Sequence, residues 1–183
     1  MNIKVKLKKI DGTKVNGTIK ILDESYIEKI MILQEQINRS LVNKEWYSPT
    51  SKEEFYMQLT KIGKIVGCVL DDNTLIAIGA YVEWGYEEHN YGYDLGIEGK
   101  KLLKVGQIEA TLVHEDYRGN KLQKKICIEI EKIAKSRKNK VIAVTVHPDN
   151  IYSLRTFEDL KYKTMLKKLK YEGLIRLVLM KKI

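Results

Sequence analysis

The chain has 183 residues, 44% of them hydrophobic and 31% charged, which is typical of one soluble domain with a hydrophobic core. Its first residues, MNIKVKLKK, alternate charged and apolar side chains, unlike the continuous apolar segment of a signal peptide. No window approaches the roughly 18 apolar residues that a membrane-spanning helix needs. We therefore expect a cytoplasmic protein that makes no use of a membrane.

The formal net charge of +9 is the unusual global number. Such a balance can indicate a nucleic acid, an anionic membrane surface or a polyanionic small molecule as partner. The lysines are spread along the whole chain without a dense basic tail, which favours a solvated lysine-rich surface over a nucleic-acid interface. Cys68 and Cys127 stand alone and far apart, without disulfide or metal-ligand spacing, so we expect buried thiols and no metal.

Hydrophobic periodicity predicts a mixed α/β (α+β) chain that forms one domain over residues 1–183. In chain order the elements are strands at 3–9 and 14–21, helices at about 24–43 and 51–61, strands at 64–70, 74–82 and 107–113, a helix to about 134, a strand at 141–146, a helix at 149–160, and strands at 163–169 and 174–181. We expect the first hairpin, at about 1–16, to be an extra arm. The Gly- and Tyr-rich connection at 83–104 is longer than most loops, which makes it a candidate functional segment.

The stretch HEDYRGNKLQKKI, residues 114–126, joins a strand to a helix whose first turn carries three lysines. Positive charge at that position opposes the helix dipole, which prefers anions at its N-terminus. An external anion resolves the conflict, because the first amides of a helix have no intrahelical partner. Gly119 would let a phosphate approach the main chain, and Arg118 is a nearby cation. The alternative is that this turn serves only as a connection.

A second informative stretch is VHPDNIYSLRTFEDLKYK, residues 146–163. It places Asn150 at the start of a helix, just after the continuous apolar strand 141–146. Clefts at the C-terminal ends of parallel strands are favoured ligand sites. The alternative is that Asn150 only caps its helix.

Together the two stretches resemble the GNAT superfamily of acyl-CoA-dependent N-acetyltransferases. The family signature is Arg or Gln, two residues, Gly, one residue, then Gly or Ala, and here it reads Arg118-Gly119-Asn120-Lys121-Leu122-Gln123. The later HPDNIYSLRTFEDLKY is similar to the family's Asn-x-x-Ser/Ala helix. The element order fits over roughly 17–181. The resemblance implies a cytoplasmic, bacterial-like enzyme with a central mixed sheet of about six to seven strands, four flanking helices and a V-shaped split between the parallel strands 107–113 and 141–146.

The resemblance also implies where acetyl-CoA, the acyl donor, would bind. Its pantetheine would pair with the edge of strand 107–113 near Leu112 and Val113. Its pyrophosphate would lie beside Arg118, on the amides from Gly119 to Gln123. The residues expected to flank the thioester are Asn150, Ser153 and Phe157.

Three positions depart from the family pattern. Lys121 stands where Gly is usual, which would cost about 1–2 kcal/mol if the position needs a positive φ. Gln123 replaces a small residue, which is tolerable if its side chain points out of the cleft. Phe157 replaces the tyrosine that protonates the departing thiolate in many members, so Tyr152 or Tyr162 becomes the candidate acid.

Glu109 is the candidate general base. Strand alternation places it with Gln107, Thr111 and Val113 on one face of strand 107–113. A carboxylate amid apolar residues is expensive to bury, and a raised pKa suits a group that takes a proton from an amine. The alternative is a structural ion pair with a neighbouring lysine.

The acceptor is expected to be a small-molecule or peptide amine, bound by the first two helices and the connection at 83–104. Trp46, Tyr81 and Trp84 are candidate substrate contacts, by stacking or cation–π interaction. Aromatic residues in these segments would equally suit a satellite core or a homodimer surface. The sequence leaves open a rival function, a non-catalytic acyl-CoA-binding or sensor module on the same fold.

Overall fold

The computed structural model describes residues 1–183, the whole of the sequence. Its strands are β1 (Asn2–Lys8), β2 (Lys14–Ile21), β3 (Gly63–Leu70), β4 (Leu75–Val82), β5 (Val105–Val113), β6 (Val141–Val146), β7 (Lys163–Lys170) and β8 (Leu174–Lys182). Its α-helices are α1 (Ile27–Ser40), α2 (Lys52–Thr60), α3 (Leu122–Ser136) and α4 (Ile151–Asp159), and short 3-10 helices are η1 (Glu24–Tyr26), η2 (Lys44–Trp46), η3 (Gly99–Lys104) and η4 (Glu115–Tyr117). The predicted order of strands and helices is confirmed.

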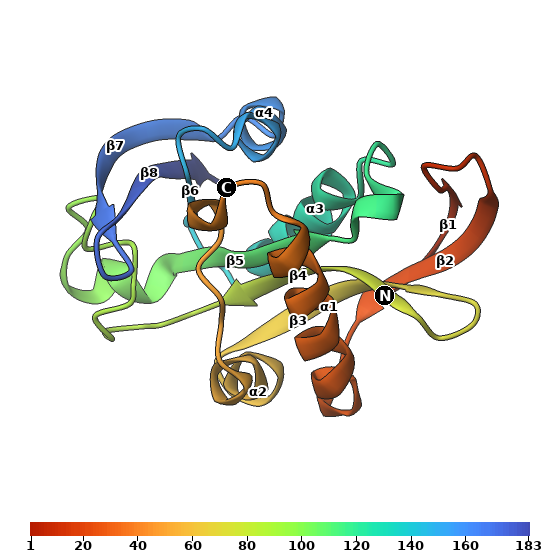
Figure 1. Ribbon diagram of the computed structural model, residues 1–183. Coiled ribbons are helices and arrows are strands. Elements are labelled where there is room, and N and C mark those ends of the chain that lie inside the picture. The colour runs from red at the N-terminus through yellow and green to blue at the C-terminus, as the bar shows by residue number, and fades with distance from the viewer.

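The eight strands form one mixed sheet in the order β1-β2-β3-β4-β5-β6-β8-β7. This is one strand more than the expected six to seven, because β1 and β2 continue the sheet: β2 pairs with β3. Helices α1 and α2 cover one face of the sheet, and α3 lies on the other (Figure 1). None of the helices combines the length and apolar content needed to cross a bilayer.

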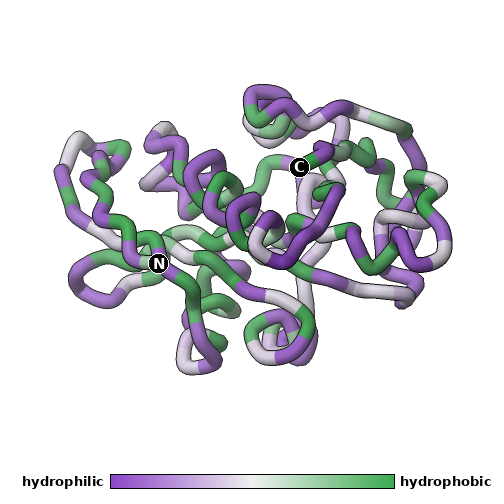
Figure 2. The backbone as a smooth tube through the Cα atoms, turned by 180° about the vertical axis from the view of Figure 1, so that it is seen from behind, coloured by the Kyte–Doolittle hydropathy of each residue, from purple (hydrophilic) through white to green (hydrophobic).

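Two separate hydrophobic clusters hold these layers together. One joins α3 and Phe157 of α4 to the sheet, and the other joins α1 and α2 to its opposite face. Figure 2 shows the corresponding pattern, with hydrophobic stretches along the central strands and hydrophilic residues in the outer turns. Because β3 and β4 pack helices on both faces, their residues are buried almost without alternation.

Strands β5 and β6 are parallel neighbours, and every other neighbouring pair in the sheet is antiparallel. Their pairing begins at Val105 with Val141 and ends at Ile108 with Val144, although β5 continues to Val113. The two strands therefore separate beyond Ile108. The V-shaped split that the resemblance implied is confirmed.

A bulge in β5 corrects the predicted alternation. The register between β4 and β5 shifts at Gly79, and Ala110 opposite it has a left-handed φ of 45°. Glu109 and Leu112 consequently lie on the side of α1 and α2, whereas the hydroxyl of Thr111 contacts α3. The prediction that Glu109 shares its face with Thr111 and Val113 is wrong, because the extra residue in the bulge reverses the alternation after Glu109.

Candidate functional site

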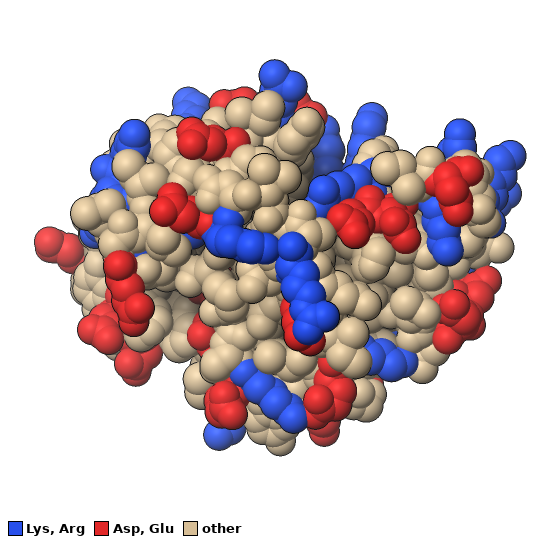
Figure 3. Space-filling model, viewed as in Figure 1, with Lys and Arg blue, Asp and Glu red and all other residues tan.

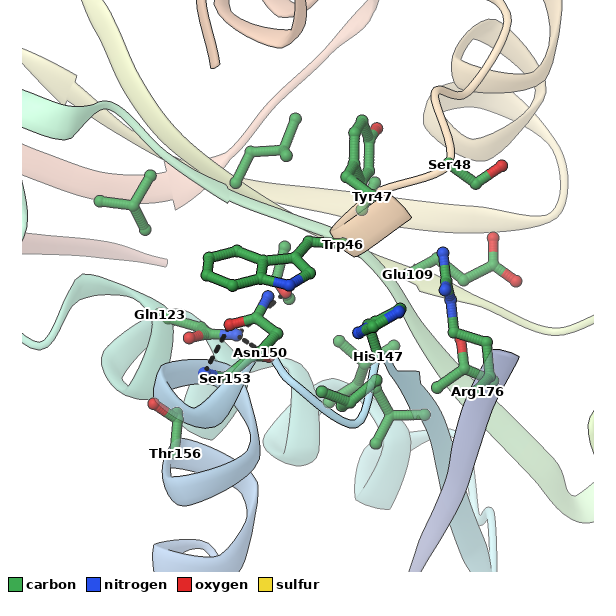
Figure 4. Close-up of a pocket in the computed structure, with 18 of the residues that line it drawn as sticks. Trp46, Tyr47, Ser48, Glu109, Gln123, His147, Asn150, Ser153, Thr156 and Arg176 are labelled. Atoms are coloured by element: carbon green, nitrogen blue, oxygen red, sulfur yellow. Dashed lines mark hydrogen bonds between the residues drawn. The ribbon is translucent and has the colours of Figure 1, made fainter. Parts of the chain in front are cut away.

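A cleft of about 1380 Å³ opens where β5 and β6 separate. Its walls come from β5, the N-terminal turns of α3 and α4, the segment 40–50 that links α1 to α2, and the turn between β7 and β8. Figure 4 shows Gln123, Ser153 and Asn150 on one side of this cleft and Glu109 and Arg176 on the other. The cleft is therefore lined by elements from both sides of the split.

The loop before α3 presents a run of unpaired backbone amides to the cleft. The amide groups of residues 119–124 make no hydrogen bond within the protein, and the first bonded amide is Lys125, which donates to the carbonyl of Lys121. Gly119 has a φ of 83°, and a Cβ built there would meet nothing within 4 Å. An anion can therefore approach the main chain closely at this point.

Lys121 precedes α3 in a left-handed conformation, with φ 57° and ψ 30°. A non-glycine residue in that conformation costs about 1–2 kcal/mol, so the sequence departure at this position carries a real strain. Lys121 is exposed and lines the cleft, where its ammonium adds to the positive potential at the helix end.

The Gln123 side chain lies across the split, contrary to the condition that it should point out of the cleft. Its Nε2 donates to Oγ1 of Thr111 on β5 (3.1 Å) and to Oγ of Ser153 on α4 (2.9 Å). These two bonds tie β5 to α4 through α3 across the mouth of the split. A ligand chain that enters along β5 meets this bridge.

Asn120 lies in the same loop but turns away from the cleft. Its Oδ1 accepts from the amide of Lys8, and its Nδ2 donates to the carbonyls of Lys8 (2.8 Å) and Tyr117 (2.9 Å). The amide of Ile10 also donates to the carbonyl of Asp116 (2.9 Å). The N-terminal hairpin therefore braces the loop that carries the free amides, a contact that no sequence pattern indicated.

Of the three residues expected to flank the thioester, two line the cleft at the start of α4 and the third does not. Asn150 caps the helix, since its Oδ1 accepts from the amide of Ser153 (3.2 Å), and both residues line the cleft. Phe157 is fully buried beside Tyr162 in the core under α3 and does not line the cleft. Tyr152 lines the cleft, with 72% of its surface exposed. The structure thus brings Asn150 and Ser153 together and leaves Phe157 outside.

Glu109 is held on the cleft wall by three donors. Trp84 Nε1 (2.9 Å) and Gln107 Nε2 (2.8 Å) donate to its Oε1, and Gln58 Nε2 donates to its Oε2 (3.1 Å). Burial, helped by the nearby Glu54 carboxylate, raises the pKa of Glu109 to about 7, although the hydrogen bonds from Trp84 and Gln107 oppose the rise. No lysine forms an ion pair with Glu109, so the structural ion-pair alternative has no support here. A carboxylate with this pKa can exchange protons near neutral pH.

The predicted aromatic contacts divide into two groups. Trp46, from η2, and Trp84 both line the cleft, and the Trp84 ring also packs against His89 at 5.0 Å. Figure 4 shows Trp46 projecting into the middle of the cleft. Tyr81 is fully buried on β4, where its hydroxyl donates to Asn139, and it does not line the cleft.

The structure adds Gln58 and Arg176, which the sequence reasoning missed, and it brings to the site Gln107 and His147, to which that reasoning assigned no functional role. Gln58 and Gln107 are buried and position Glu109. His147, at the end of β6, has its Nε2 3.6 Å from a carboxylate oxygen of Glu45. Arg176 is a buried arginine within the apolar run of β8, a pattern visible in the sequence. No cluster of three or more His, Cys, Asp or Glu side chains suited to a metal is found.

A model of the acetyltransferase (GNAT) family matches residues 20–162. The chain belongs to the GNAT family of acetyltransferases. No curated protein sequence matches it significantly. The family match includes β5, the loop before α3 and all of α4, which build the cleft.

Solved structures share this acetyltransferase's fold. The GNAT domain of S. lividans PAT is 16% identical with a TM-score of 0.67, over 98% of this chain and 97% of that one. The ribosomal-protein-S18-alanine N-acetyltransferase of Escherichia coli is 12% identical with a TM-score of 0.67, over 91% and 94%. The yncA protein of Salmonella typhimurium, determined with its cofactor acetyl-CoA, is 13% identical with a TM-score of 0.66, over 91% and 94%. At these identities the likeness shows the fold alone.

Proposed function

We propose that this GNAT enzyme transfers an acetyl group from acetyl-CoA to a primary amine, small-molecule or peptide, by direct attack in a ternary complex. The observation that carries the proposal is the open split between β5 and β6, which has unpaired amides of residues 119–124 on one side and the Glu109 carboxylate on the other. The first feature suits a pyrophosphate and the second suits an amine that must lose a proton.

Acetyl-CoA would lie along the split. Its pyrophosphate would accept from the free amides of residues 119–124, with Arg118, Lys121, Leu122 and Gln123 around it. Because the amide of His114 donates to Ile76 on β4, the preceding amide of Val113 points away from β4 and toward the split. That amide, beside Leu112, would polarise the thioester carbonyl. Asn150 and Ser153 would flank the thioester.

The reaction needs the amine to lose a proton, and a second proton transfer to the departing thiolate would assist it. The amine nitrogen attacks the thioester carbonyl, its proton goes to Glu109, and the C–S bond breaks to release CoA as a thiolate. A thiol with a pKa of about 8.5 is a tolerable leaving group in water, so an acid assists without being essential. Tyr152 is the candidate acid because it lines the cleft on α4, and Trp46 and Trp84 would wall the acceptor.

A second candidate function is a non-catalytic acyl-CoA-binding or sensor module. The absence of a tyrosine at Phe157 and the Gln123 bridge across the split favour it. A nucleic-acid-binding role has less support, because basic and acidic side chains are interspersed on the face shown in Figure 3.

Isothermal titration with acetyl-CoA tests the proposal first, with dephospho-CoA and ATP as controls. We expect micromolar binding of acetyl-CoA, followed by amine-dependent release of free thiol across a panel of amines. The acid limb of the kcat/KM profile should lie near pH 7 and disappear in Glu109→Gln, since burial raises the pKa of Glu109 to about 7. Binding without thiol release for any amine would favour the sensor module, and no binding would refute both.

A further inference from the structure

Arg176 on β8 is a buried cation without an anionic partner. Only 2% of its surface is exposed, yet it forms no ion pair with an aspartate or glutamate. Its Nη1 donates to the carbonyl of Ile175 (2.8 Å), and its Nη2 is buried with no hydrogen-bond partner. Buried charges are normally paired, because removing them from water costs several kcal/mol. This guanidinium therefore lacks the anion that its environment requires.

The aromatic ring of Tyr171 packs against the guanidinium and holds it in one orientation. It lies 5.4 Å from the centre of the Tyr171 ring, a cation–π contact. The Tyr171 hydroxyl is hydrogen-bonded to Thr145 Oγ1 (2.9 Å) and to the Tyr91 hydroxyl. Such fixed stacking suits the planar arginine side chain and leaves its outer N–H groups available for a ligand.

The charged groups around Arg176 are already engaged. The Glu45 carboxylate raises the pKa of Arg176 without forming an ion pair with it, and lies 3.6 Å from Nε2 of His147; Glu109 accepts three hydrogen bonds. The neighbouring cations Lys168 and Lys170 of β7 both pair with Asp94. Burial lowers the pKa of Arg176, as expected for a cation with no close counter-charge.

An anion that binds Arg176 would be distinct from the phosphates of the acyl donor. Figure 4 shows Arg176 on the same side of the cleft as Glu109, with Gln123 and the N-terminus of α4 on the opposite side. The unpaired amides that suit a pyrophosphate begin at residue 119, before α3. Arg176 instead lines the same side of the cleft as Glu109, the carboxylate that we assign to the amine.

We propose that Arg176 binds a carboxylate of the acceptor, so that the acceptor is an amino acid or another amine that also carries a carboxylate. This inference rests on the proposed function. The two oxygens of a carboxylate match the paired N–H groups of a guanidinium, which would fix the distance between the anion and the reacting nitrogen. A polyamine would bring a second positive charge to Arg176 and is disfavoured.

Matched acceptors test the proposal by thiol release with acetyl-CoA. The panel contains amino acids such as glycine, alanine and lysine, each beside its carboxamide, with cadaverine as the decarboxylated form of lysine and aminomethylphosphonate as a tetrahedral anion. The parent should prefer the best carboxylate over its carboxamide by about 10- to 100-fold in kcat/KM. Preference for the carboxamides, for cadaverine or for the phosphonate would overturn the proposal.

Variants then assign any preference to Arg176. Arg176→Met should lower kcat/KM for the carboxylates to about that of their carboxamides, and Arg176→Lys should keep part of the preference. Arg39→Met is the matched control, because it removes the same charge from an exposed position on α1 outside the cleft. A preference that survives in both Arg176 variants, folded by circular dichroism, would refute the assignment.

Binding of the same compounds to CoA-saturated protein separates this inference from the transferase proposal. Carboxylate binding that depends on Arg176, without any thiol release, would support the anion site while the transferase proposal fails. Turnover with equal kcat/KM for carboxylates and carboxamides would support the transferase proposal and overturn the anion site. Equal binding of acids and amides without turnover would overturn the anion site as well.

Discussion

Replacing Glu109 with glutamine should make the protein more stable at alkaline pH, and by an amount that grows with pH. The substitution keeps the shape of the side chain and removes its charge. Trp84 and Gln107 can still donate to the amide oxygen. The new amide nitrogen faces Gln58, whose buried Oε1 has no partner and can accept from it after the Gln58 amide turns over.

The magnitude follows from the pKa of Glu109. Burial raises this pKa from 4.5 to about 7, so the folded state binds more protons than the unfolded state between these values. Stability of the parent therefore falls as pH rises through this window, and the full loss is present above pH 7. A rise of about 2.5 pKa units corresponds to about 3 kcal/mol, of which about 2–3 kcal/mol falls between pH 5 and 8.

Urea unfolding followed by circular dichroism measures this effect. We expect the free energy of unfolding of Glu109→Gln, relative to the parent, to increase by about 2–3 kcal/mol from pH 5 to pH 8. Glu35→Gln is the control, because it makes the same chemical change at an exposed position on α1. Parallel curves for Glu109→Gln and the parent over this range would refute a buried, neutral-pH carboxyl at this site.

Two further predictions concern the loop before α3. Lys121→Gly should relieve the left-handed strain and stabilise the fold by about 0.5–1 kcal/mol, while weakening acetyl-CoA through loss of a phosphate contact. Lys138→Gly is the control, because Lys138 has a φ of 62° beyond the other end of α3; it should give the same stability gain without changing the affinity for acetyl-CoA. Equal affinities of the two variants for acetyl-CoA would exclude a contact between Lys121 and the phosphates. Gln123→Ala removes the bridge to Thr111 and Ser153 and should tighten acetyl-CoA binding several-fold in titration; weaker binding would show that Gln123 holds the ligand instead.

Local patterns in the sequence predicted much of the fold. The order of strands and helices, the buried parallel strand 141–146 and the turn at Gly119 were all visible, because each depends on periodicity or on conformational preferences of neighbouring residues. The lysines at the start of α3 marked the place where backbone amides lack partners. Glu109 stood out as a carboxylate within an apolar strand, and the structure places it on the cleft wall.

Tertiary packing decided the direction of the side chains. The bulge at Ala110 shifts the register of β5 against β4, and no periodicity in β5 shows it. Phe157 turns into the core because α4 packs against α3 on that side, whereas Gln123 turns into the split because Thr111 and Ser153 lie within its reach. The burial of Arg176 without an anion depends on β7, β8 and the connection at 83–104 meeting around it. Contacts between residues far apart in sequence fix these positions, so local preferences determined the elements and the assembled fold determined the chemistry of the cleft.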